Sequence, residues 1–298
     1  MPYSIRSDLA LECKELLRDE CTGVFSEENY FGDIKITRIT VENDEGARRI
    51  GKPCGTYTTI ELPSISQQSE NDEDARTAIS VELTRLLPKD GPVLVAGLGN
   101  SDITPDALGP KTIEKILATR HISGELSRSI GLGELRPVAA VSPGVLGKTG
   151  IETAEILSGI VGRVCPSSVI VIDALASRRL ERLGKTVQIS NTGIAPGSGV
   201  GNRRSEISAA SLGVPVISMG VPTVVDALTL AHDILLDDDD KDDKSEKSGA
   251  KVFPSAAEMM VTPREIDTVI SGAAQLMALG INCTLHPHLT PEELLLLT

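Results

Sequence analysis

The chain has 298 residues and a formal net charge of −13, and its charge and composition exclude several classes of function. An acidic protein repels a phosphate backbone, and the absence of tryptophan leaves little to stack on bases, so we expect no nucleic-acid partner. No apolar run approaches the length that spans a membrane, and the N-terminus has no apolar core of a signal peptide. We therefore expect a soluble cytoplasmic protein with no membrane partner.

The first predicted elements are a helix and two strands. The helix starts after Ser7 or Asp8, because the leucines that follow recur near helical spacing. Residues 34–41 and 55–62 alternate apolar and polar side chains, which is typical of half-exposed strands. We expect these two strands to form an antiparallel hairpin added to the main sheet. The segment 74–87 predicts a helix that leads into the next strand.

The stretch from Val93 to Pro110, VLVAGLGNSDITPDALGP, combines a buried strand, a glycine turn and a helix start. Thr104 is a good N-cap and Pro105 suits the first helical position, so Asp106 is predicted in the first turn of that helix. A carboxylate is stabilised there by the helix dipole. Asp106 is thus expected at the carboxyl edge of the sheet, where ligands bind in open α/β folds.

A second strand of the same design, SSVIVIDALAS, is predicted over 167–177 and ends in the carboxylate of Asp173. Two parallel strands would therefore bring two acids to one edge of a sheet. Further along, the run TVQISNTGIAPGSGVGNRR predicts a strand followed by a glycine-rich loop, and Thr223 is expected to cap a helix after the next strand. Strands that alternate with helices predict a three-layer, doubly wound, mostly parallel α/β sheet with helices on both faces.

The C-terminal third contains a dense charge block and two amphipathic segments. Residues 236–251 are almost devoid of apolar side chains, which favours a disordered acidic loop. A final apolar helix is predicted from Pro263 to about Leu279, and the tail could pack on the protein's own core or on a partner subunit. No boundary divides residues 9–298, which we expect to form a single domain.

The sequence gives little support for several kinds of site at this edge of the sheet. The run GLGNSD lacks the third glycine of a dinucleotide fingerprint, and GSGVGNRR lacks the lysine of a P-loop. No histidine accompanies a nucleophile motif of a serine or cysteine hydrolase. Two neighbouring carboxylates remain, and such a pair can share a proton and activate a water. Each acid alone would have an ordinary structural explanation, as a helix-end charge or a turn acid.

Six long runs resemble the germination proteases of spore-forming bacteria, and they are GLGNSDITPDALGP, SPGVLGKTGIET, IDALASRRLERL, QISNTGIAPGSGVGNRR, LGVPVISMGVPTVVDA and MVTPREID. The resemblance covers nearly the whole chain. It implies an atypical aspartic endopeptidase that degrades small acid-soluble spore proteins, with a fold similar to hydrogenase maturation proteases. It also implies that Asp106 and Asp173 are the catalytic pair, and that no cofactor is required.

The same resemblance implies a zymogen with a short propeptide. In SIRSDLALE the expected cleavage falls between Asp8 and Leu9, so that residues 1–8 form the propeptide. It further implies a homo-oligomer, a tetramer in the family, located in the cytoplasm of the forespore and spore core. An oxyanion role for Gly193, Gly197 and Gly199 is a hypothesis from glycine content alone.

One departure from relatives concerns metal binding. Ala195 stands in GIAPGSG where related sequences commonly carry histidine, and two carboxylates without a histidine make a poor transition-metal site, so no metal is expected. Two alternatives stay open. The chain could be an acidic, non-enzymatic binder of basic nucleoid or spore proteins, or, on fold analogy alone, a phosphorylase-like or amidase-like enzyme with a small-molecule substrate.

Overall fold

The computed structural model describes residues 7–17, 22–63, 65, 73–129, 131–198, 204–231 and 259–298. The acidic segment 236–251, Gly199 and most of the expected propeptide lie outside these ranges. Within them, one sheet has the strand order β1-β2-β3-β7-β8-β6-β4-β5, with β9 paired to β8. The strands are β1 (Val24–Phe31), β2 (Ile34–Val41), β3 (Gly55–Glu61), β4 (Val93–Gly97), β5 (Val138–Val141), β6 (Ser168–Ser177), β7 (Thr186–Ser190), β8 (Val216–Asp226) and β9 (Met260–Val261).

The centre of the sheet, β8-β6-β4-β5, is parallel, which confirms the predicted α/β class with a parallel core. Every residue of β4 is buried, as expected for a strand covered on both faces. The remaining pairs, from β1 through β7 to β8 and from β8 to β9, are antiparallel. The parallel core therefore carries an antiparallel extension on the β8 side.

The predicted antiparallel pairing of 34–41 with 55–62 is confirmed, with Val41 opposite Gly55. Their connection was wrongly predicted as a turn, because it contains the helix α2 (Asp44–Ile50). Asn43 caps this helix through a hydrogen bond from the Gly46 N–H. The unit also has a third strand, β1, which precedes β2 and was not predicted. Its polar residues face solvent on both sides, so it lacks the alternation of a half-buried strand.

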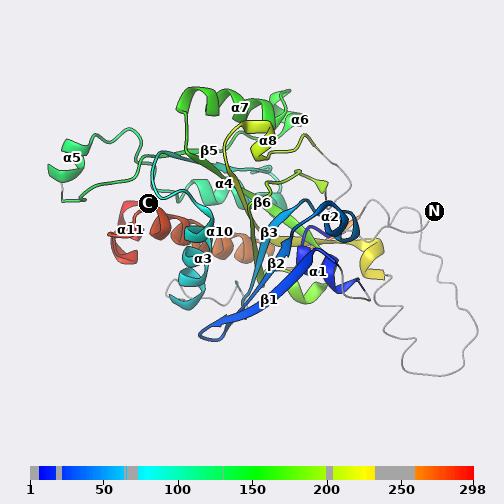
Figure 1. The fold of residues 1–298 in the computed structure, drawn as a ribbon. Helices are drawn as coiled ribbons and strands as arrows, with labels where there is room; N and C mark the ends of the chain where they lie inside the picture. Colours follow the sequence, from blue (N-terminus) through cyan, green and yellow to red (C-terminus); the bar gives the residue numbers. More distant parts are fainter. Residues whose placement is uncertain are drawn as a thin grey trace, which may run out of the picture.

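Helices cover both faces of the sheet (Figure 1). One apolar core packs α3, α4 and α10 against the sheet, and a second core packs α7 and α8 against the opposite face. The α-helices are α1 (Ala10–Glu15), α2 (Asp44–Ile50), α3 (Glu73–Leu86), α4 (Leu108–Ile113), α5 (Gly124–Ser129), α6 (Leu146–Thr149), α7 (Thr153–Val164), α8 (Ala209–Leu212), α10 (Ile266–Leu285) and α11 (Pro291–Leu297), and two short 3₁₀ turns are η2 (Thr104–Asp106) and η3 (Leu180–Arg182).

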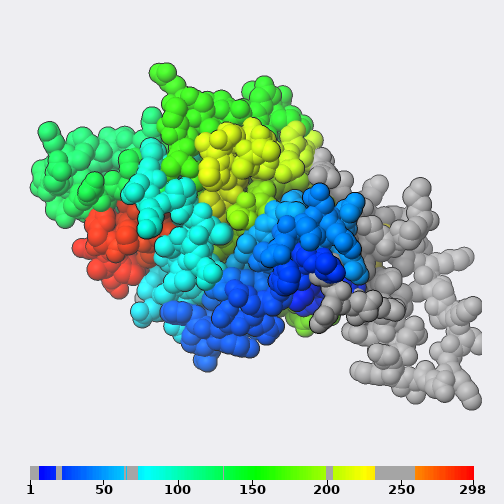
Figure 2. Space-filling model, in the orientation of Figure 1, coloured from blue at the N-terminus to red at the C-terminus, as the bar shows by residue number. Residues whose placement is uncertain are grey.

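The C-terminal helices differ from their predicted bounds. The expected helix over 263–279 is α10, which begins at Ile266 and runs to Leu285. By length and composition α10 is apolar enough to cross a membrane, contrary to the sequence reading, but 67% of its most apolar window is buried inside the molecule. The tail forms α11, whose N-cap Thr290 and Glu293 make a capping box. In the space-filling view, α11 in red and the N-terminal strands in blue occupy separate parts of the same face (Figure 2).

Strand β4 and helix α4 touch through their backbones at two glycines. A Cβ on Gly97 would lie 2.2 Å from the carbonyl oxygen of Gly109, and a Cβ on Gly109 would lie 2.2 Å from the oxygen of Leu98. The helix therefore sits closer to the sheet than side chains would allow. This close approach sets the path of the connecting residues, which include Asp106.

We predict that Gly109→Ala lowers the free energy of unfolding by about 2 kcal/mol or more, because the new methyl group meets rigid backbone. The matched control is Gly159→Ala in α7, where an added Cβ meets nothing within 4 Å. The control should be stabilised by about 0.5–1 kcal/mol, since alanine is the better helix former. Urea unfolding of both variants measures the difference, and equal midpoints would contradict this account.

Candidate active site

Asp106 lies in the connection between β4 and α4. It lies in the first turn of a helix, as predicted, with Pro105 near the helix start, but that helix is the short 3₁₀ turn η2, whose N-cap is Ile103 and not Thr104, and α4 begins only at Leu108. The carboxylate of Asp106 accepts a hydrogen bond from the backbone N–H of Asn100 at 2.8 Å. The loop closes tightly at Gly99, whose φ is +110° and whose added Cβ would lie 2.0 Å from the Asp106 carbonyl oxygen. A side chain at Gly99 would therefore displace Asp106.

Asp173 lies within β6, four residues before the end of that strand, so the prediction that it ends the strand was wrong. The neighbouring strand explains its position. The last residue of β4, Gly97, is opposite Ile172, and β6 continues beyond that point paired with β8 and no longer with β4. Asp173 consequently stands just past the carboxyl end of β4. It is 6% exposed, and its carboxylate accepts a hydrogen bond from the N–H of Ala174 at 3.0 Å.

The structure brings the two predicted acids to one cavity of about 620 Å³. Gly197, from the glycine-rich loop after β7, lines the same cavity, as does Arg204. Gly193 does not line it, and its absence of a side chain has a packing reason: a Cβ there would lie 2.1 Å from the carbonyl oxygen of Ile207. The oxyanion role of these glycines stays a prediction.

The electrostatics of the two acids differ from those of surface carboxyls. Burial raises the pKa of Asp173 well above its ordinary value, and the charges of Asp106 and Asp8 raise it further. Burial also raises the pKa of Asp106, while the hydrogen bond from Asn100 opposes that rise. A pair of this kind retains a proton more readily than two isolated acids. It can therefore provide a proton donor and a proton acceptor in the same cavity.

Thr223 also lines this cavity, and its predicted position was wrong. It does not cap a helix but lies inside β8, at the residue where the β6–β8 register slips: Leu175 is opposite Pro222, whereas Ala176 is opposite Val224. Such a bulge re-aims a side chain. The Thr223 hydroxyl is buried and has no hydrogen-bond partner among the described residues. No sequence signal marks a bulge inside an apolar run.

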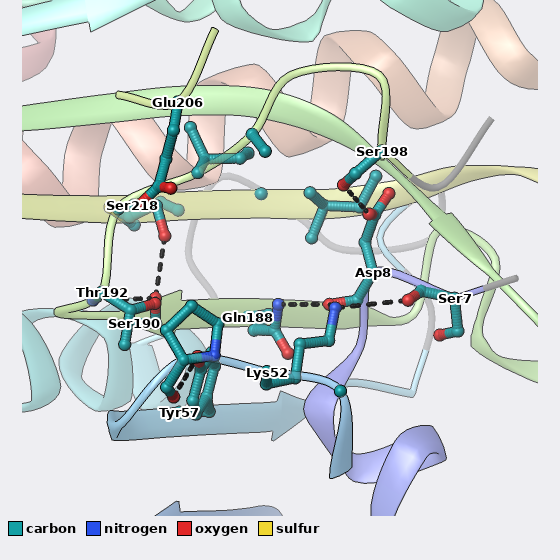
Figure 3. A pocket seen from close by; sticks show the side chains of 18 residues that line it. Ser7, Asp8, Lys52, Tyr57, Gln188, Ser190, Thr192, Ser198, Glu206 and Ser218 are labelled. Atoms are coloured by element: carbon teal, nitrogen blue, oxygen red, sulfur yellow. Dashed lines mark hydrogen bonds between the residues drawn. The ribbon is translucent and has the colours of Figure 1, made fainter. Parts of the chain in front are cut away.

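The expected processing junction, Asp8–Leu9, lies against a neighbouring cavity of about 470 Å³, which Asp8 and Gly193 help to line (Figure 3). The Asp8 carboxylate accepts hydrogen bonds from the N–H of Ala176 and from the hydroxyl of Ser198, both at 2.9 Å. The Leu9 side chain is fully buried. The junction is therefore ordered on the surface of β6, close enough to Asp173 for Asp8 to raise its pKa.

No three His, Cys, Asp or Glu side chains gather as a metal site within the residues that the structure describes.

Comparisons with known proteins agree with one another. A family model described as "Germination protease" matches residues 7–237. Germination proteases from Caldanaerobacter subterraneus subsp. tengcongensis and Clostridium perfringens are 47% and 42% identical to this chain, and the alignments cover 97–98% of both partners. The enzyme from Bacillus velezensis is 36% identical over 98% of this chain and 96% of its own length. Among solved structures, a [NiFe] hydrogenase maturation protease, HycI from Thermococcus kodakarensis, aligns at 15% identity with a TM-score of 0.36, covering 66% of this chain and 96% of its own.

A mixed α/β sheet with one buried and one half-buried carboxyl on the same cavity, together with the match to a peptidase family, defines the protein as a protease. The chain belongs to the germination protease family.

We predict that Asp173→Asn raises the Tm near neutral pH. Because folding raises the pKa of Asp173, the folded state binds more protons than the unfolded state between the two pKa values. Stability therefore falls as pH rises through that window, and a neutral asparagine removes this loss. Below the unfolded pKa of about 3.9 the variant should gain nothing, because the aspartate is then protonated in both states.

The matched control for this measurement is Asp102→Asn, in the same loop as Asp106. Asp102 is exposed and pairs with Lys148, which lowers its pKa, so its replacement should not raise the Tm at neutral pH. Thermal unfolding of both variants from pH 3 to pH 8 tests the account. A gain for Asp173→Asn that is independent of pH would refute the assigned cause.

Proposed function

We propose that the protein is an endopeptidase that degrades small acid-soluble spore proteins during spore germination. The observation that carries the proposal is the pair of carboxyls, Asp106 in the turn after β4 and Asp173 in β6, which line one cavity and both have raised pKa values. The substrate class follows the family to which the chain belongs. The proposed setting is the cytoplasm of the forespore and spore core, and the proposed state is a homo-oligomer.

The proposed mechanism uses one water and one shared proton. The ionised member of the pair takes a proton from the water as it attacks the peptide carbonyl, and the protonated member donates a proton to the leaving amine. A raised pKa supports this division, because a carboxyl that keeps its proton near neutral pH can act as an acid. Asp173 is the more buried of the two and feels the charge of Asp106, so it is the better candidate for the protonated role.

We further propose that the chain is a zymogen that cuts its own Asp8–Leu9 bond. Three features of the junction support this. Asp8 pairs with β6 through its backbone N–H and the Ala176 carbonyl at 2.9 Å, as an added strand of substrate would. Its carboxylate has polar partners, and the apolar Leu9 side chain is buried. An acid followed by an apolar residue is therefore bound on β6, within electrostatic reach of Asp173.

We predict that Asp106→Asn and Asp173→Asn each reduce cleavage of a small acid-soluble spore protein by at least about 100-fold, because each removes a group that transfers a proton. Both variants should remain folded by circular dichroism, and Asp102→Asn should cleave at the wild-type rate. Products are identified by mass spectrometry. Activity in either folded variant close to that of wild type would mean that the pair is misassigned.

The same assay separates the alternatives. A stable complex with no fragments would indicate a binding protein, and release of a small product with no peptide cleavage would indicate a small-molecule enzyme. Chelation with EDTA should leave the rate unchanged. A loss of activity that one added metal restores would instead indicate a metallopeptidase.

Incubation of the full-length protein should also yield a single processed form that begins at Leu9, with loss of residues 1–8. Intact-mass measurement and N-terminal sequencing of sporulated or acid-incubated material read this directly. The active-site variant Asp173→Asn should stay at full length under the same conditions. Wild-type protein that keeps Met1 or Pro2 at its N-terminus would rule out processing at this bond.

A further inference from the structure

The carbonyl oxygen of Asp8 accepts hydrogen bonds from two side-chain donors. Lys52 Nζ lies 2.9 Å from it and Gln188 Nε2 lies 3.0 Å from it. Gln188 also bridges to the far side of the junction, because its Oε1 accepts the backbone N–H of Ala10 at 2.8 Å. The amide of Gln188 thus spans the Asp8–Leu9 bond, while Lys52 adds a positive charge at the carbonyl end (Figure 3).

The register of the sheet places Gln188 in line with the candidate dyad. Asp173 of β6 is opposite Gly220 of β8, and Gly220 is opposite Gln188 of β7. Residues paired in this way point to the same face of a sheet, and two strand spacings separate their Cα atoms by about 10 Å. The middle residue of the row, Gly220, has no side chain of its own, and the side chain of Leu175 packs against it instead.

The N-terminal segment is held by both strands that flank β8. The Asp8 N–H bonds to Ala176 on β6, and the Ala10 N–H bonds to the Gln188 side chain on β7, so the Asp8–Leu9 junction is fixed from both sides. Gly220 lines the cavity beside Asp8. A Cβ on Gly220 would lie 2.5 Å from the Asp173 carbonyl oxygen and 2.6 Å from Leu175 Cγ, so glycine is required at this position.

Lys52 is held in place by its own loop. It follows Gly51, which ends α2 in the left-handed conformation with φ of 70°. After it, the Pro53 carbonyl accepts a hydrogen bond from the Tyr57 hydroxyl at 2.8 Å. Besides Asp8, the Lys52 ammonium bonds to the Ser7 carbonyl at 3.2 Å. The loop therefore directs the ammonium at two consecutive carbonyls just before the bond to be cut.

We propose that Lys52 and Gln188 form the oxyanion site for hydrolysis of the Asp8–Leu9 bond. The inference rests on the proposed function, since it takes that bond as the one cleaved, and it replaces the glycine-rich loop as the source of oxyanion donors for this step. Donors that already lie about 3 Å from the carbonyl oxygen are positioned for the negative charge that develops on it.

The reaction balances with water as the only co-reactant. The water oxygen bonds to the Asp8 carbonyl carbon and gives one proton to the ionised aspartate of the dyad, while the carbonyl π electrons move to the oxygen that Lys52 and Gln188 hold. The carbonyl then re-forms, the bond to the Leu9 nitrogen breaks, and the protonated aspartate gives that nitrogen its proton. The products are a new carboxylic acid at the Asp8 carbonyl carbon, which loses its proton to solvent, and a free amine on Leu9, and the dyad again holds one proton.

The test compares Lys52→Met and Gln188→Glu with wild type in the rate at which full-length protein becomes the form beginning at Leu9. Each variant should process about 100-fold more slowly or worse, the usual loss for one oxyanion donor. Gln188→Glu keeps an acceptor for the Ala10 N–H but places negative charge at the oxyanion. Lys52→Arg should process faster than Lys52→Met, and the exposed control Lys89→Met should match wild type.

Amide hydrogen exchange separates catalysis from docking. In the uncut Asp173→Asn background, the N–H groups of Asp8 and Ala176 should stay protected when Lys52→Met or Gln188→Glu is added, because both bond to partners other than Lys52 and Gln188. Slow processing with protection retained supports the inference. Processing at the wild-type rate overturns it, and so does slow processing with protection lost, since the two residues would then only dock the segment.

Failure of the proposed function would look different. Wild-type protein would then not be cut at Asp8–Leu9, or Asp173→Asn would still be cut. Neither result depends on Lys52 or Gln188.

Discussion

The structure of the site depends on one constraint: the ionisable carboxyl group of Asp173 is buried in the middle of the sheet. The lengths of the strands beside it make this burial possible. Asp173 is there because β4 stops at Gly97 while β6 runs on for five residues beyond Ile172. The end of β4 is fixed by the hydrogen bond from the Leu98 N–H to the Ile172 carbonyl at 2.8 Å, after which the chain turns away. Burying a charge is costly, so this carboxyl keeps a proton over a wider pH range than a surface acid does.

Glycines on either side of the pair provide the space for it. Gly99 lets the turn after β4 fold back onto the backbone of Asp106, and Gly220 keeps the strand beside Asp173 free of a side chain. In each case an added Cβ would strike the backbone of the aspartate itself, at 2.0 Å and 2.5 Å. The two acids are therefore set by backbone contacts and by strand register. Few side-chain hydrogen bonds are needed to hold them.

This origin explains what the sequence could predict. Runs of β-branched or alternating residues correctly predicted β2, β3, β4, β6 and β7. The spacing of apolar residues along the sequence indicates which side chains of a strand are buried. The order of strands and turns also pointed to Asp106 and Asp173 as a pair, and they do share a cavity. The position of Asp173 inside a strand was not predictable, since it depends on the length of β4, a distant segment.

The sequence did not predict the roles of three residues, Lys52, Gln188 and Thr223, and the reasons are related. Lys52 lies in a segment that read as a turn, where a lysine is ordinary, and Gln188 occupies one polar position of a short strand. Their hydrogen bonds to Asp8 join residues that are 44 and 180 positions apart in the sequence, and no local pattern predicts such contacts. Thr223 was predicted to cap a helix after the strand, but the strand continues through it to Asp226.

The N-terminal segment is anchored differently on the two sides of Asp8–Leu9. After the junction, Leu9 and Ala10 are fully buried, and the buried Glu12 carboxylate accepts the N–H groups of Arg178 and Arg179 at 2.6 and 3.0 Å. Glu12 also pairs with Arg182 at 3.3 Å. Before the junction, Ser7 is only half-buried. The buried side chains and the Glu12 contacts lie on the Leu9 side, whereas Asp8 is held by hydrogen bonds from Ala176, Ser198, Lys52 and Gln188. A cut at this bond would therefore leave the new N-terminus fixed to the sheet by its own buried side chains.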